Sequence, residues 1–161
     1  MIDPPAIVQT EALPYAFIHL TIPRTEMHAV LPPTLTELFA AVKAQGLPIV
    51  PWFAHHLTLS EGDFDFEACI PVDSSFVPVG RVQRGLWPAG NVARTTYHGD
   101  YPGLPNAWRQ FSDWITQHGH ARANHIYEHY VVHQGVTKMP AEFRTELSWP
   151  LIEPSKESEQ A

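Results

Sequence analysis

One short segment, residues 124–133, carries an acid where an acid is unexpected. The segment is rich in aromatic and β-branched residues, which predicts a strand whose side chains alternate between two faces. Glu128 and Tyr130 then share a face with Ile126 and Val132. An unpaired carboxylate removed from water costs on the order of several kcal/mol or takes up a proton, so Glu128 needs a compensating partner. That partner is either an internal arginine or a ligand that is cationic or donates hydrogen bonds. The candidate arginines are Arg94, Arg109 and Arg144.

Aromatic side chains offer walls for a planar organic ligand, because they supply large apolar faces and cation–π attraction of roughly 0.5–2 kcal/mol each. The candidates for such walls are Trp52, Trp87, Tyr130 and Trp149. Core packing is the alternative role for the three tryptophans, since large aromatics are mostly buried. Further aromatic residues fall at the spacing of a helix core stripe, and we expect them to pack in the core. These are Trp108, Phe111 and Trp114.

Ten histidines bring a metal site into consideration. They include His55-His56, His118 with His120, and the alternating set His125, His129 and His133. Adjacent strand residues point to opposite faces, the chain lacks a helical HExxH motif, and a lone cysteine cannot form a thiolate cluster. We therefore expect no metal and no other cofactor, and the three-histidine strand face is the best remaining case. A nucleophilic serine is also unsupported, because no Gly-x-Ser-x-Gly motif occurs.

The elements that position these residues follow from hydrophobic periodicity and turn residues. In the first half we predict a strand, an amphipathic helix that follows Pro32-Pro33 and ends at Gly46, and a hairpin; these strands span 15–22, 49–59 and 64–72. After a short strand at 81–86, the second half repeats the order, with strands at 91–98, 124–133 and 143–151 and a helix that ends at Gly119.

The two predicted halves also share sequence. Phe64, Glu67 and Pro71 recur in register as Phe143, Glu146 and Pro150. The helix positions Leu35, Leu38, Val42 and Gly46 recur as Trp108, Phe111, Ile115 and Gly119. Self-similarity over this length predicts a duplicated half-domain, with a pocket where the halves meet at a pseudo-twofold axis. Glu67 and Glu146 alternate with apolar residues, so we expect them on the polar face, either solvated or paired across strands, with Arg144 as a candidate partner.

Length and composition limit the classes of protein to which this chain can belong. A chain of 161 residues has the length of one domain, which we expect over residues 1–152. The two repeats of this domain should span about 12–72 and 90–152. The polar tail at 153–161 is expected to be disordered. A formal charge of −7 disfavours direct nucleic-acid binding. One cysteine excludes an intrachain disulfide, no signal peptide is evident, and no apolar run approaches the length needed to cross a bilayer. We expect a cytoplasmic protein that does not enter membranes.

Four motifs, in their joint order, resemble the GyrI-like, or AraC effector-binding, small-molecule-binding domains over about residues 10 to 152. They are Phe64-Asp-Phe-Glu-Ala-Cys-Ile-Pro-Val72, Trp87-Pro-Ala-Gly90 leading into Tyr97-His-Gly-Asp-Tyr101, the helix ending in Trp114-Ile115, and Tyr127-Glu-His-Tyr130. The resemblance implies an α+β fold of two βαββ repeats around a pseudo-twofold, with a ligand cavity between them. It also implies that an acid at the position of Glu128 meets amphipathic, often cationic, ligands. The segment Pro51-Trp-Phe-Ala-His-His56 departs from the family pattern, so the ligand chemotype does not carry over.

Three functions are compatible with this resemblance. The first is a stand-alone sensor or sequestering domain for a small organic compound, read out by a regulator. The second is a hydrolase, since some members of the family are described as opening strained cyclopropane rings in natural products. Glu128, with a pKa raised by burial, would then act as general acid or base and Tyr130 as hydrogen-bond donor. The third is an inhibitor that binds a protein partner of the gyrase type.

Overall fold

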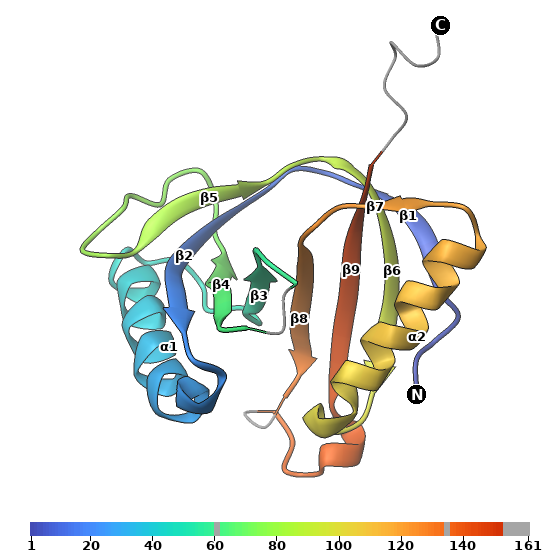
Figure 1. Ribbon diagram of the computed structural model, residues 1–161. Coiled ribbons are helices and arrows are strands. Elements are labelled where there is room, and N and C mark those ends of the chain that lie inside the picture. The colour runs from blue at the N-terminus through green and yellow to red at the C-terminus, as the bar shows by residue number, and fades with distance from the viewer. Residues whose placement is uncertain (60–61, 134–135, 153–161) are drawn as a thin grey trace, which may run out of the picture.

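Alternating apolar residues build one curled antiparallel sheet, with two helices against one of its faces (Figure 1). The computed structural model describes residues 1–59, 62–133 and 136–152. Part of the first predicted hairpin turn, residues 60–61, and the predicted tail at 153–161 lie outside these ranges. The elements of the first half are β1 (Ala6–Thr10), β2 (Leu13–Ile22), α1 (Met27–Ala44), β3 (Phe53–His56) and β4 (Phe64–Pro71). Those of the second half are β5 (Gln83–Trp87), β6 (Gly90–His98), α2 (Leu104–Gln117), β7 (Ala121–Arg122), β8 (Ile126–Val132) and β9 (Arg144–Ile152).

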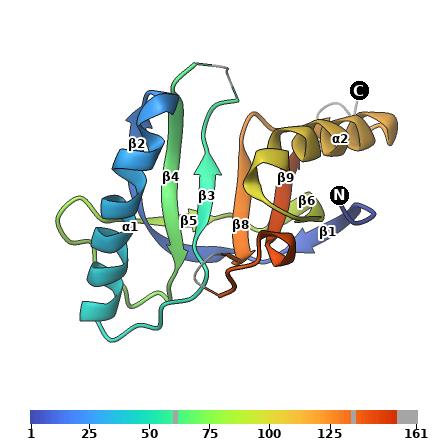
Figure 2. The same cartoon turned by 90° about the horizontal axis from the view of Figure 1, so that it is seen from below.

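The strand order is symmetric about the centre of the sheet. The order β1-β6-β9-β8-β3-β4-β2-β5 places β3 beside β8, with the remaining strands of each half outward from this pair. Figure 2 shows β2, β4, β3, β8 and β9 in a row, with α1 beside one end and α2 beside the other. This arrangement confirms the predicted α+β fold, in which the two halves meet at a pseudo-twofold between β3 and β8.

The outermost strands exchange between the halves. β1 precedes β2 in the chain but pairs with β6, and β5 precedes β6 but pairs with β2. β1 was not predicted, because a five-residue edge strand with mostly exposed or half-buried side chains has little periodic signal. The exchange ties the two halves together through backbone hydrogen bonds at both edges of the sheet.

Each helix covers its own half of the sheet with an apolar stripe. Those stripes consist of Leu38 and Val42 with buried Thr34 in α1, and Leu104, Ala107, Phe111 and Ile115 in α2. Phe111 therefore lies in the core as predicted, whereas Trp108 and Trp114 are only partly buried beside it. Both helices end before a glycine in the left-handed region, Gly46 at φ 75° and Gly119 at φ 76°, where a side chain would be strained.

The first helix begins earlier than the prolines predicted. α1 starts at Met27, and Pro32 and Pro33 lie inside it instead of before it. Each proline lacks an N–H donor and therefore forgoes one hydrogen bond to the carbonyl four residues earlier. The early turns still form, packed against the sheet through Val30 and Leu31. Here tertiary packing outweighs the local preference of proline for helix starts.

Candidate functional site

A cavity of about 860 Å³ opens between the two helices, a volume typical of small-molecule sites. Its floor is the face of the sheet at the β3–β8 junction, which includes Ala54, His56, Ile126, Glu128 and Tyr130. One wall comes from α1, through Met27, Leu31 and Leu35. The opposite wall comes from α2, through Leu104, Trp108, Arg109 and Ser112. The cavity therefore lies on the symmetry element of the sheet, where neither helix covers the strands.

The carboxylate of Glu128 lies at the floor of this cavity and is 8% exposed as a residue. Trp108 Nε1 donates a hydrogen bond to Oε2 at 2.5 Å, and the Tyr130 hydroxyl donates to Oε1 at 2.8 Å. His56 Nε2 lies 3.4 Å from Oε1. None of the three arginines proposed from the sequence contacts this carboxylate, so its partners come from a tryptophan, a tyrosine and a histidine.

These contacts set the protonation state of Glu128. Burial acts to raise its pKa, but His56 and the hydrogen bonds from Trp108 and Tyr130 together outweigh burial and lower the pKa below its ordinary value. The expectation of a raised pKa was therefore wrong, because it counted the apolar surroundings and not the donors within them. Glu128 is ionised at neutral pH and presents a negative charge to the cavity.

Tyr130 is held as a donor beside this charge. Burial and the neighbouring Glu128 carboxylate raise the pKa of its hydroxyl well above the ordinary value. The Tyr130 ring packs against Trp52 with 4.5 Å between ring centroids, and it meets Tyr101 edge-on at 6.0 Å. The hydroxyl therefore stays protonated while the ring forms part of an aromatic wall.

Four of the five predicted site residues line the cavity. Glu128, Tyr130, Trp52 and Trp149 all do so. Trp149 also contacts Trp108, with 5.6 Å between ring centroids. Trp87 does not line it: its ring stacks on Tyr127, at 3.6 Å between centroids, in a separate apolar cluster. Tyr127 points away from the cavity because it neighbours Glu128 on an alternating strand, so Trp87 lies on the opposite face of the sheet.

Two contacts of Glu128 were not predicted from the sequence. Trp108 was assigned to the core, yet its indole N–H reaches the carboxylate from α2. His56 was considered only as a metal ligand, yet β3 brings it beside Glu128. The sequence repeat gave one indication of the role of Trp108. This residue is a large aromatic with an N–H donor at the position where the first half has the smaller Leu35. The approach of His56 depends on strand pairing across the symmetry element and has no local signature.

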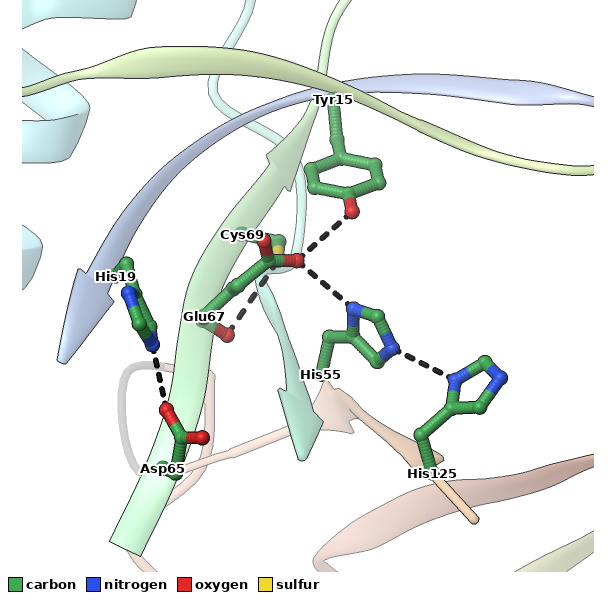
Figure 3. Close-up of polar contacts among 7 residues, drawn as sticks. All are labelled: Tyr15, His19, His55, Asp65, Glu67, Cys69 and His125. Atoms are coloured by element: carbon green, nitrogen blue, oxygen red, sulfur yellow. Dashed lines mark hydrogen bonds and ion pairs between the residues drawn. The ribbon is translucent and has the colours of Figure 1, made fainter. Parts of the chain in front are cut away.

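The face of the sheet opposite the cavity carries a second polar network (Figure 3). Glu67 Oε1 accepts from the Tyr15 hydroxyl at 2.8 Å and lies 2.8 Å from His55 Nδ1. His55 Nε2 in turn lies 2.8 Å from His125 Nδ1. Glu67 thus pairs across strands as predicted. Its repeat counterpart Glu146 also pairs, but with Arg94 at 3.4 Å, not with Arg144.

The three histidines of β8 and its end do not share one face. His125 lies in the network opposite the cavity, whereas His133 lines the cavity. A register shift between Tyr130 and Val132 breaks the alternation between them. Over residues 1–59, 62–133 and 136–152, no group of three or more His, Cys, Asp or Glu side chains is placed to hold a metal ion. No helix in the same ranges is long and apolar enough to span a membrane.

A cavity at the junction of two strand–helix halves, with a buried acid at its floor, agrees with a family comparison. Residues 3–152 match the model of the GyrI-like small molecule binding domain. The chain belongs to this GyrI-like family. The match covers both halves of the sheet, both helices and every residue that lines the cavity. The sequence matches no protein of curated function.

Solved structures of this GyrI-like domain's relatives share its fold. The C-terminal domain of EcmrR superposes with a TM-score of 0.81 at 21% identity, over 94% of this chain and 98% of that domain. In a DNA complex of EcmrR, this chain covers 58% of the longer EcmrR chain. SAV2435 bound to tetraphenylphosphonium has a TM-score of 0.68 at 12% identity, over 93% and 94% of the two chains. A hydrolase from Listeria innocua has a TM-score of 0.68 at 11% identity, over 92% of this chain and 91% of the hydrolase. These identities establish the fold alone.

Proposed function

We propose that this domain binds amphipathic organic cations in the cavity between its helices and acts as a sensor or sequestering protein. The observation that carries the proposal is the Glu128 carboxylate, which is ionised and buried at the floor of an aromatic-walled cavity. Residues 1–152 would act as one domain, and any transcriptional readout would need a further partner.

The contacts of Glu128 favour a cationic ligand. Two of its donors, the Trp108 indole and the Tyr130 hydroxyl, are neutral, and His56 is the one partner whose side chain can carry a positive charge. Neutral donors satisfy hydrogen bonds but leave most of the negative charge uncancelled. In a site of low polarity this charge attracts a cation more strongly than it would in water. Trp52, Trp149 and Tyr130 add aromatic faces suited to cation–π contact.

Tetraphenylphosphonium is a suitable probe of this proposal. It is a cation that carries only apolar aryl groups, and SAV2435, which shares this fold, was solved bound to it. Neutral triphenylphosphine oxide supplies similar aryl groups without the charge. A thermal-shift titration with both compounds should give concentration-dependent stabilisation by the cation, about 2.7 kcal/mol at a hundredfold excess over Kd. The neutral compound should stabilise the domain much less. Equal stabilisation by both compounds would contradict a site selective for charge.

A hydrolase is the second candidate, because an ionised carboxylate beside a protonated tyrosine can direct water at a bound substrate. The lowered pKa of Glu128 favours a general base over a general acid. Mass spectrometry of each stabilising compound after incubation separates the two functions. An unchanged compound supports binding alone, and a product heavier by one water supports hydrolysis. If no small molecule stabilises the domain, an inhibitor that binds a protein partner becomes the leading function.

A further inference from the structure

Glu128 is one of several charged residues around the cavity, and the two arginines that line it differ in their surroundings. Arg24 stands on the α1 side, where Asp63 also lines the cavity. Its Nε donates to the Gly62 carbonyl at 2.8 Å, and its guanidinium lies 4.2 Å from the centroid of the Phe64 ring. This arginine is engaged by the protein itself.

Arg109 stands on the opposite, α2 side, one residue after Trp108. It is exposed, and no hydrogen bond or ion pair to any described residue engages its guanidinium. Asp113 is four residues further along the helix, the spacing of a helix ion pair, yet no ion pair joins these two described side chains. Arg109 therefore offers its full set of donors to the cavity and to solvent.

Ser112 lines the same wall and is supported from behind by a second guanidinium. Arg122 Nη1 donates to the Ser112 hydroxyl oxygen, and the Arg122 guanidinium lies 5.0 Å from the Trp149 ring centroid. Because Ser112 accepts this charge-assisted bond, its own hydroxyl proton is left to donate. Hydrogen bonds in such a chain polarise one another, which strengthens Ser112 as a donor. The α2 wall thus combines a free guanidinium with a polarised hydroxyl.

We propose that Arg109 and Ser112 form an acceptor subsite, so that the preferred ligands are amphoteric: a cationic group at Glu128 and a carboxylate or similar acceptor at the α2 wall. This inference rests on the proposed function and adds the chemistry of the second end of the ligand. A cavity with Glu128 alone would disfavour a carboxylate on the ligand, because two like charges would share one site. A preference for the anionic group is therefore diagnostic of the subsite.

A matched pair of dyes tests the proposal. Rhodamine 6G is an ethyl ester with one positive charge, and its parent acid rhodamine 19 carries the same cationic ring system with a free carboxylate. Fluorescence anisotropy at low salt should give wild-type protein about two- to fivefold tighter binding of the acid, the range for an exposed ion pair. Arg109→Gln should remove this preference, because it weakens binding of the acid relative to the ester. Ser112→Ala should reduce the preference.

Arg84→Gln is the control, because Arg84 is exposed on β5, outside the cavity, and its loss changes the net charge equally. This variant should keep the wild-type preference. If the ester binds at least as tightly as the acid in wild type, or if Arg109→Gln and Arg84→Gln change the preference equally, the subsite is refuted while the cation site stands. If neither dye nor tetraphenylphosphonium binds, the proposed function fails, and the subsite fails with it.

Discussion

The Glu128 carboxylate joins two requirements that usually conflict, burial and charge. Burial alone would favour the neutral acid, and a buried arginine partner would cancel the charge. Neither outcome occurs here, because the carboxylate oxygens contact Trp108, Tyr130 and His56. These contacts supply hydrogen bonds to the oxygens and keep the group ionised. The result is a negative centre held in place before any ligand arrives, so binding needs little reorganisation.

The lowered pKa of Glu128 makes a prediction about stability and pH. A group whose pKa is lower in the folded state stabilises the fold above its unfolded pKa, here near the ordinary value of 4.5, and this contribution is lost as pH falls through the folded pKa. At pH 7 we expect Glu128→Gln to unfold with about 1–3 kcal/mol less free energy than wild type. Urea unfolding across pH 7 to pH 3 should show this difference shrinking below about pH 4.5. A difference that grows on acidification would mean that the folded pKa is raised.

At the scale of elements, the β3–β8 pair explains why the cavity floor carries one acid, Glu128. In the strand register, Glu67 lies opposite His55, and its repeat counterpart Glu146 lies opposite His129. His55 and His129 are therefore equivalent positions of the two halves. The residues that precede them, Ala54 and Glu128, are equivalent as well. Ala54 also lies directly opposite Glu128 in the sheet. A second acid there would place two like charges side by side, whereas alanine leaves room above the floor.

A substitution at Ala54 tests the cavity without altering Glu128. Ala54 is 1% exposed and lines the cavity floor, so Ala54→Leu directs three extra carbons into the open space beside the carboxylate. We expect at least about tenfold weaker binding of tetraphenylphosphonium, with a smaller change in melting temperature than a close-packed core site would give. Calorimetric titration measures the affinity, and Ala54→Ser is the control that keeps the volume small. Undiminished affinity in Ala54→Leu would place the ligand elsewhere.

Strand alternation was enough to predict that Glu128 and Tyr130 share a face, and helix periodicity predicted both helices. The same logic could not say which face Trp87 joins, because Trp87 ends β5, and that strand pairs with the other half of the molecule. Nor could it identify His56 as a partner of Glu128, since their contact depends on which strands meet at the centre. Pairing between distant strands is decided by the whole sheet, and single-strand patterns do not encode it.

At the scale of the whole molecule, the exchanged edge strands hold the two halves in register around the cavity. β1 covers the edge of β6, and Asp3 adds contacts: its carbonyl accepts from Thr95 at 2.7 Å, and its carboxylate lies 2.7 Å from His98 Nε2. The cavity walls belong to different halves, so their spacing depends on these contacts as well as on β3 and β8.

Deletion of residues 1–10 tests this dependence. The deletion removes β1, with the half-buried Val8, and leaves β6 as an unpaired edge. We expect a lower melting temperature, together with concentration-dependent association through the exposed β6 edge. Thermal unfolding and size-exclusion chromatography measure the two effects. A truncated chain that stays monomeric with an unchanged melting temperature would show that β1 is dispensable.

The most direct measurement is calorimetric titration of tetraphenylphosphonium into wild type, Glu128→Gln and Glu146→Gln. The two variants remove the same charge from the neighbouring strands β8 and β9, but Glu146 lies on the face opposite the cavity, beside Arg94. We predict one saturable site in wild type, at least about tenfold weaker binding in Glu128→Gln, and an affinity within about twofold of wild type in Glu146→Gln. Equal affinity in wild type and Glu128→Gln would contradict the central claim that the buried carboxylate recognises the ligand.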